Sequence, residues 1–196
     1  MGKYYNNLLS FLKIIEGIEG DLIEVGTHNG RTTKILCDYV QNNKLNKKVF
    51  SIDTFEGYIK EDLKDALPET QTHAKNHSWE YPYEKVLKFL EPYNNFCTIW
   101  KGDSKIEIPK KIKDNTISKV CLLYVDCNLY PPSIKCIKDV FPLISKGGVV
   151  VIDEHWLDKY GKYGGESKAL FEFANMIGVK PKFWKSEPGP SYYIIK

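Results

Sequence analysis

The sequence predicts an α/β fold with a Rossmann-like, seven-stranded, mostly parallel sheet, helices on both faces and an antiparallel C-terminal hairpin strand. Short apolar segments alternate with segments of helical spacing along the chain, which is typical of such a sheet. The most apolar short segment, Val120–Asp126, has the continuous apolar run of a strand that is buried on both faces. Because 196 residues with 42% apolar content supply one core, we expect a single domain over residues 1–196.

Five segments are expected to be parallel strands whose carboxyl ends share one edge of the sheet. They are Leu22–Gly26, Val49–Asp53, Phe96–Gly102, Val120–Asp126 and Val149–Asp153. Apolar residues at intervals of three and four predict helices, namely Tyr4–Ile18 (within residues 1–20), Thr32–Val40, Tyr83–Leu90, Pro131–Ile144 and Glu166–Ile177. Lys182–Lys185 and Tyr192–Ile195 flank a Glu-Pro-Gly-Pro turn, which indicates a hairpin at the sheet edge.

Two long connections interrupt this alternation, at residues 54–82 and 155–165. Both follow the carboxyl ends of strands, where ligands bind in open α/β sheets. We therefore predict that residues 54–82 form a lid or a substrate-binding loop, with an ordinary surface loop as the alternative.

Composition favours a soluble, cytoplasmic protein without a nucleic-acid partner. The net charge is only +3, and Arg31 is the single arginine among 28 basic residues that are scattered along the chain. No stretch approaches the roughly 18 apolar residues of a membrane helix. The five cysteines are odd in number and form no CxxC pair, so buried free thiols are expected.

Acidic and glycine residues follow the first three expected strands. Glu24 precedes a Gly26-x-x-x-Gly30 loop, Asp53 ends the second strand, and Gly102-Asp103 closes the third. The loop is not G-x-G-x-x-G, which argues against a dinucleotide. A strand-end carboxylate suits ribose hydroxyls, so an adenosine-type ligand is predicted. Strand-end aspartates also cap helices and form turns, and that alternative stays open.

Three further carboxylates follow the fourth and fifth strands: Asp126, Asp153 and Glu154. Neighbouring strands lie about 5 Å apart, so these groups are expected to converge and repel one another. A hard cation such as Mg²⁺ would relieve that repulsion through oxygen ligands. The alternative is that Asp126 caps the following helix and Glu154 faces solvent.

Four motifs together resemble the TylF/MycF family of macrocin O-methyltransferase-like, class I S-adenosylmethionine-dependent enzymes. The motifs are Glu24-x-Gly26-x-x-x-Gly30, Asp53-Thr54-Phe55-Glu56-Gly57, Val125-Asp126-Cys127-Asn128-Leu129-Tyr130 and Val151-Ile152-Asp153-Glu154. The resemblance implies a class I methyltransferase fold and Mg²⁺-dependent methylation of a hydroxyl, typically on a sugar of a natural product. It places the metal on Asp126, Asp153 and Glu154. The methyl donor would bind Glu24, Gly26, Thr27, Asn29, Gly30, Asp53, Thr54, Gly102, Asp103 and Asp126.

The sequence departs from this family at the proposed general base. The family pattern L-D-x-D-L-Y has a carboxylate where this chain has Asn128, and an amide cannot take a proton. His155 directly follows the metal acids and is the remaining candidate base, beside Asp126 as the other predicted catalytic residue; a surface histidine is the alternative. The acceptor is expected to be a hydroxylated small molecule, and a homo-oligomer is compatible with the sequence.

Two rival functions stay open. One is a metal-independent methyltransferase of the same fold that acts on nucleic acid or on protein nitrogen. Asn128-Leu129-Tyr130-Pro131-Pro132 lacks the Pro-Pro directly after the polar residue that such enzymes carry. The other is a non-catalytic, nucleotide-binding relative that lost its base at Asn128.

Overall fold

The computed structural model describes residues 6–64, 66, 68–76, 78–153, 164–184 and 192–196 and contains the expected seven-stranded sheet. The strand order is β3-β2-β1-β4-β5-β7-β6. Five strands are parallel: β1 (Asp21–Val25), β2 (Val49–Asp53), β3 (Cys97–Lys101), β4 (Val120–Val125) and β5 (Ile144–Ile152). Two antiparallel strands complete the sheet, β7 (Tyr192–Ile195) beside β5 and β6 (Lys182–Phe183) at the edge.

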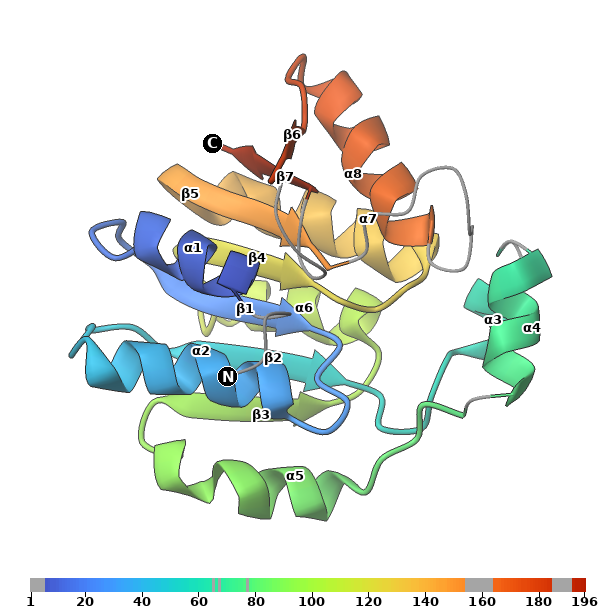
Figure 1. The fold of residues 1–196 in the computed structure, drawn as a ribbon, viewed down its shortest axis with the longest axis horizontal. Helices are drawn as coiled ribbons and strands as arrows, with labels where there is room; N and C mark the ends of the chain where they lie inside the picture. Colours follow the sequence, from blue (N-terminus) through green and yellow to red (C-terminus); the bar gives the residue numbers. More distant parts are fainter. Residues whose placement is uncertain (1–5, 65, 67, 77, 154–163, 185–191) are drawn as a thin grey trace.

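Helices cover both faces of the sheet (Figure 1). One face packs against α1 (Asn6–Ile14), α2 (Arg31–Asn42) and α5 (Tyr83–Leu90), and the other against α6 (Ser104–Lys113), α7 (Tyr130–Val140) and α8 (Gly164–Met176). Successive strand residues point to opposite faces. Leu22 therefore belongs to one apolar core and Ile23 to the other. Apolar runs in the central strands thus stabilise both layers at once.

Two short helices lie beyond the carboxyl ends of the strands, in the connection predicted to be a lid. They are α3 (Lys60–Leu63), which contacts α7, and α4 (Pro68–Asn76); Figure 1 shows both. An isolated antiparallel bridge between Glu56 and Glu80 joins the two arms of this connection. The described residues of this connection (54–64, 66, 68–76 and 78–82), here called the inserted segment, therefore lie at the edge of the sheet where a ligand is expected.

Three sequence expectations about helices were wrong. The helix expected over Tyr4–Ile18 ends at Ile14. No helix was expected at 104–113, because its charges and Pro109 obscure the helical spacing, yet α6 forms there with Asp103 as its N-cap. The helix expected to reach Ile144 ends at Val140, because Pro142 lacks the N–H that a further helical turn needs. A 3₁₀ turn (Phe141–Leu143) follows, as another (Glu91–Tyr93) follows α5. No helix in the described ranges is long and apolar enough to cross a membrane.

Candidate functional site

A cavity of about 370 Å³ opens at the carboxyl edge of the sheet. Loops that follow β1 to β5 all contribute to its wall, which is the expected position for a ligand. The wall contains these residues predicted from the sequence: Gly26, Thr27, Asn29, Asp53, Thr54, Gly102, Asp103, Asp126 and Asp153. Glu24 and Gly30 are not part of the wall, and Glu154 and His155 lie outside the described residues.

The glycine loop is shaped by close contact with the loop after β4. Gly26 has a φ of 98°, and a Cβ there would lie 1.7 Å from the backbone oxygen of Asp126. Only glycine fits this approach. The next side chain, Thr27, is 3% exposed, and its Oγ1 is buried with no hydrogen-bond partner within the described ranges. Buried polar atoms are normally satisfied, so Thr27 Oγ1 is an exception among the described residues, and the residue itself lines the cavity.

Asp53 both forms a turn and lines the cavity. Its Oδ2 accepts a hydrogen bond from the His28 N–H at 2.7 Å, and its Oδ1 accepts one from the Phe55 N–H at 2.8 Å. The turn-forming alternative is therefore confirmed for Asp53. Its two oxygens carry about four acceptor positions, so ribose hydroxyls can still bind to the face that lines the cavity.

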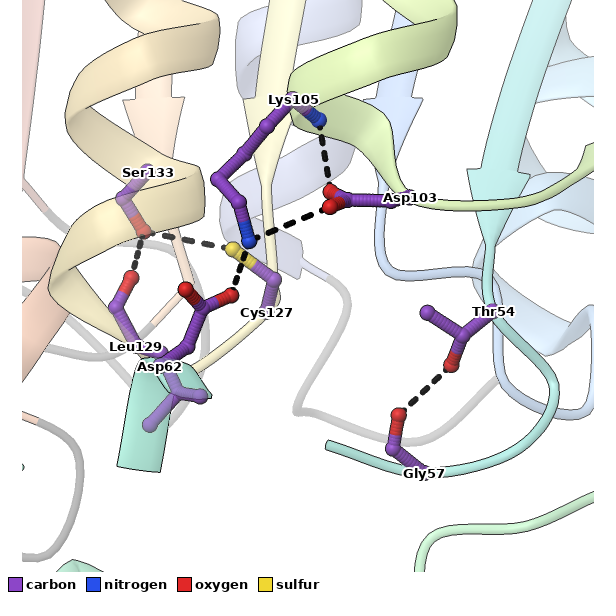
Figure 2. Close-up of polar contacts among 8 residues, drawn as sticks. All are labelled: Thr54, Gly57, Asp62, Asp103, Lys105, Cys127, Leu129 and Ser133. Carbon is purple, nitrogen blue, oxygen red and sulfur yellow. Dashed lines mark hydrogen bonds and ion pairs between the residues drawn. The ribbon is translucent and has the colours of Figure 1, made fainter. Parts of the chain in front are cut away.

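Asp103 caps α6 and joins an ion-pair cluster in the cavity wall. Its Oδ1 accepts the Lys105 N–H at 2.9 Å, and its Oδ2 lies 3.3 Å from Lys105 Nζ. Figure 2 shows the same Nζ reaching Asp62 on α3. Burial alone would lower the pKa of Lys105, but the hydrogen bond to Asp62 and the charges of both acids raise it. Lys105 therefore stays charged and links α6 to the inserted segment.

Glu24 lies beneath the cavity and not in its wall. Its Oε2 accepts hydrogen bonds from Thr33 Oγ1 at 2.5 Å and Ser51 Oγ at 2.6 Å, and the side chain is fully buried. Burial raises the pKa of Glu24 to about 7, although both hydrogen bonds lower it. The described contacts of this carboxyl group are internal, and its role in donor binding stays a prediction.

The raised pKa of Glu24 predicts a pH-dependent free energy of unfolding. Between the ordinary value of 4.5 and about 7 the folded chain holds a proton that the unfolded chain has lost. Stability should therefore fall as pH rises through this window, by up to roughly 3 kcal/mol, and level off above it. Urea unfolding at about pH 5 and about pH 8 measures this slope. Glu24→Gln should flatten it, whereas the exposed control Glu84→Gln should not; an unchanged slope in Glu24→Gln would contradict the assignment.

Asp126 and Asp153 follow neighbouring strands and both line the cavity. Their strands are paired at Val125 and Ile152, and the Asp153 N–H donates to the Val125 carbonyl at 2.9 Å. The Asp153 carboxylate accepts a hydrogen bond from the Tyr124 hydroxyl. The alternative that Asp126 is the N-cap of the next helix was wrong, because the N-cap of α7 is Leu129.

The possible metal ligands at these strand ends suit a hard cation only in part. Asp126 and Asp153 supply carboxylate oxygens, which Mg²⁺ prefers. Within the described ranges, no group of three acidic, histidine or cysteine side chains is placed to hold a metal ion. The third predicted ligand, Glu154, lies outside those ranges.

Asn128 is fixed in the cavity wall by two groups that the sequence did not single out. Its φ is 64°, and its N–H and that of Cys127 both donate to Glu166 Oε1 at 2.5 Å. Its Nδ2 donates to Tyr58 Oη at 2.8 Å. Glu166 lies in the first turn of α8. An acid at this position of the sequence indicates the start of a helix, and nothing in the sequence indicates that its side chain is buried and binds backbone N–H groups. The Tyr58 hydrogen bond ties the inserted segment to the loop after β4.

Cys127 also lines the cavity, and its thiol lies 3.2 Å from Ser133 Oγ (Figure 2). Burial raises the pKa of this thiol well above its ordinary value. A protonated thiol is a poor nucleophile. The five cysteines are all free, as expected, and Cys127 is the one that is only partly buried.

His28 joins the glycine loop to the inserted segment. Its ring lies edge-on to Trp79 and Tyr81, with ring centroids 5.4 Å apart in each pair. Burial lowers the pKa of His28, while Asp53 raises it less. The imidazole is therefore neutral at neutral pH. His28 and Trp79 both line the cavity, so the two loops form one continuous wall.

The fold is that of a class I methyltransferase. The chain belongs to the methyltransferase domain family, whose model matches residues 23–155, more than half of the chain. A curated relative is the 8-demethyl-8-(2,3-dimethoxy-alpha-L-rhamnosyl)-tetracenomycin-C 4'-O-methyltransferase of Streptomyces olivaceus, with 23% identity over 154 residues. The match covers 74% of this chain and only 56% of that relative, so the chain spans little more than half of its length.

Solved structures show the same fold. The calicheamicin methyltransferase CalS11 superimposes with a TM-score of 0.77 at 20% identity, over 96% of this chain and 77% of CalS11. The O-methyltransferase NovP superimposes with a TM-score of 0.77 at 18% identity, over 97% of this chain and 78% of NovP. Identities this low establish the shared fold alone.

Proposed function

We propose that the chain transfers a methyl group from S-adenosylmethionine to a hydroxyl of a sugar-containing small molecule, with a divalent cation, in the manner of the TylF/MycF enzymes. The observation that carries the proposal is the cavity wall. It combines a glycine loop, an acid at the end of β2 and two acids at the ends of β4 and β5. Membership of a methyltransferase family supports the reaction class.

The proposed donor would lie across the carboxyl ends of the strands. The Gly26 turn and Thr27 suit the amino-acid part of the donor, because both line the cavity directly after β1. Asp53 suits the ribose hydroxyls. The cavity volume of about 370 Å³ is within the range of small-molecule sites.

Transfer requires the acceptor oxygen to lie about 3 Å from the methyl group and to lose its proton. Asp126, Asp153 and Glu154 would hold the cation, which when bound orients a hydroxyl and lowers its pKa. His155 follows these acids directly and is the proposed acceptor of the proton. Asn128 cannot take it, but its fixed backbone and its bond to Tyr58 shape the wall there.

The names of the comparison proteins support a sugar-containing acceptor. The Streptomyces olivaceus relative is named for 4'-O-methylation of a rhamnosyl tetracenomycin, and CalS11 is titled a calicheamicin methyltransferase. We therefore propose a deoxysugar hydroxyl as the acceptor. Methyl transfer to a panel of rhamnosides, compared with RNA and a lysine peptide, tests this class; methylation of RNA or peptide alone would favour the nitrogen-methylating rival.

The proposed ribose contact predicts weaker donor binding when Asp53 is replaced. Asp53→Asn keeps one acceptor oxygen but loses the charge, so the affinity for S-adenosylhomocysteine should fall roughly 10-fold or more, the value of hydrogen bonds to a charged group. Isothermal titration calorimetry measures the change. Asp38→Asn, on α2 and not in the cavity wall, removes a carboxylate that binds Lys34 and Tyr93 and should leave the affinity unchanged. Equal affinities in Asp53→Asn and the unmodified chain would exclude Asp53 from the site.

A further inference from the structure

The short helix α3 buries an acid. Of its four residues, Lys60 and Glu61 are exposed and Leu63 is half-buried, while Asp62 is only 8% exposed. A helix in an ordinary surface connection would turn its leucine inward and its carboxylates toward water. A buried carboxylate is costly unless it is paired. The burial of Asp62 therefore requires a partner of opposite charge, and it indicates that the carboxylate has a role inside the molecule.

Lys105 is the partner. Its Nζ forms an ion pair with Asp62 Oδ2 and lies 3.3 Å from Asp103 Oδ2, as Figure 2 shows. One ammonium group thus faces two carboxylates, which leaves the cluster with one net negative charge beside the cavity. Asp103 Oδ1 is taken by the Lys105 N–H. In the described part of the chain, no donor contacts Asp62 Oδ1.

The strand order places this cluster at the nucleobase end of the cavity. The glycine loop follows β1, Asp53 follows β2, and β3 lies one strand further out. A nucleoside whose ribose is held at Asp53 must therefore extend its base over the end of β3. Gly102, Asp103 and Ser104 line the cavity there.

Apolar groups complete the surroundings of this end. Helix α3 packs against α7, and the cavity wall includes Leu129 and Pro132 at the start of α7 and Ile59 at the start of α3. Apolar surfaces suit the faces of a flat heteroaromatic ring. The free carboxylate oxygen of Asp62 suits a hydrogen-bond donor on its edge.

We propose that Asp62 determines the donor's nucleobase, by accepting a hydrogen bond from an exocyclic amino group through Oδ1, with Lys105 as its positioning residue. This rests on the proposed function, in which the donor is S-adenosylmethionine and the base is adenine. A base with a carbonyl in that position would set its oxygen against the carboxylate, and the two acceptors would repel each other. The inserted segment thereby selects the donor as well as bordering the cavity.

The test compares two probes by calorimetry: S-adenosylhomocysteine and S-inosylhomocysteine, which carries a carbonyl in place of the amino group. The unmodified chain should prefer the adenosyl probe by about 10-fold or more. Asp62→Asn should bind both probes within about 3-fold, because an amide both donates and accepts. Glu61→Gln, the exposed neighbour on the same helix, should keep the full preference.

A full preference in Asp62→Asn, or none in the unmodified chain, would overturn the assignment of Asp62. Failure of the unmodified chain to bind either probe would overturn the proposed donor itself, so the two failures are distinguishable. Lys105→Gln provides a second variant that leaves Asp62 in place. It should reduce the preference for the adenosyl probe, and an undiminished preference there would contradict the positioning role of Lys105.

Discussion

Asp153→Asn is expected to lower the rate of methyl transfer at least about 100-fold while the chain stays folded. Asp153 ends β5 in the cavity wall, next to Asp126 at the end of β4. Asparagine keeps the shape and still accepts the Tyr124 hydrogen bond, but it removes the charge that a divalent cation requires. Losing several kcal/mol of transition-state stabilisation corresponds to a loss of this size. Initial rates at saturating donor, with and without added Mg²⁺, measure it.

A matched control separates the charge of Asp153 from its local packing. Tyr124→Phe removes the hydroxyl that donates to Asp153 and leaves both carboxylates in place. Its rate should fall far less than that of Asp153→Asn. Full activity of the unmodified chain in excess EDTA would contradict the cation requirement and favour the metal-independent rival.

His155→Ala is expected to reduce the rate by roughly 10²- to 10⁴-fold, the usual contribution of a general base. The TylF/MycF enzymes that the sequence resembles have a carboxylate where this chain has Asn128, and an amide cannot take up the proton of the acceptor hydroxyl. Because the donor contacts are proposed at the glycine loop and Asp53, the affinity for S-adenosylhomocysteine should not change. Single-turnover rates and calorimetry together measure this separation.

A double variant tests the proposed role of His155 as general base by supplying another proton acceptor. Adding Asn128→Asp to His155→Ala should recover part of the lost rate, because it places a carboxylate at the position where the TylF/MycF enzymes carry one. A His155→Ala enzyme with the unmodified rate would assign deprotonation to the cation and water instead, and would remove His155 from the mechanism.

The sheet was predictable because its strands are encoded locally. Val120–Val125 and Val149–Ile152 are continuous apolar runs, and such runs form strands buried on both faces. Helix α6 was not predictable in the same way. Its apolar positions are few, Pro109 lies inside it, and its start is stabilised by a cap from Asp103 that the sequence shows only as a strand-end acid.

The strand-end acids of the site were predictable, because the carboxyl ends of parallel strands meet at one edge. Asp53, Asp103, Asp126 and Asp153 do line one cavity. Glu24 does not, because its side chain points from the strand into the core, where Thr33 and Ser51 bind it.

The contribution of the inserted segment could not be predicted from local patterns. Tyr58, Asp62 and Trp79 line the cavity through contacts with Asn128, Lys105 and His28 respectively. Each contact joins residues that are far apart in the sequence. A polar segment has no regular spacing of apolar residues from which its buried side chains could be predicted.

The proposed function requires the cavity at the carboxyl edge of the sheet to hold the methyl donor. Calorimetric titration of the unmodified chain with S-adenosylhomocysteine measures this binding, with the same titration of Asp53→Asn alongside. We expect saturable binding of one ligand per chain, weakened roughly 10-fold or more in the variant. Absence of binding by the folded, unmodified chain would contradict it.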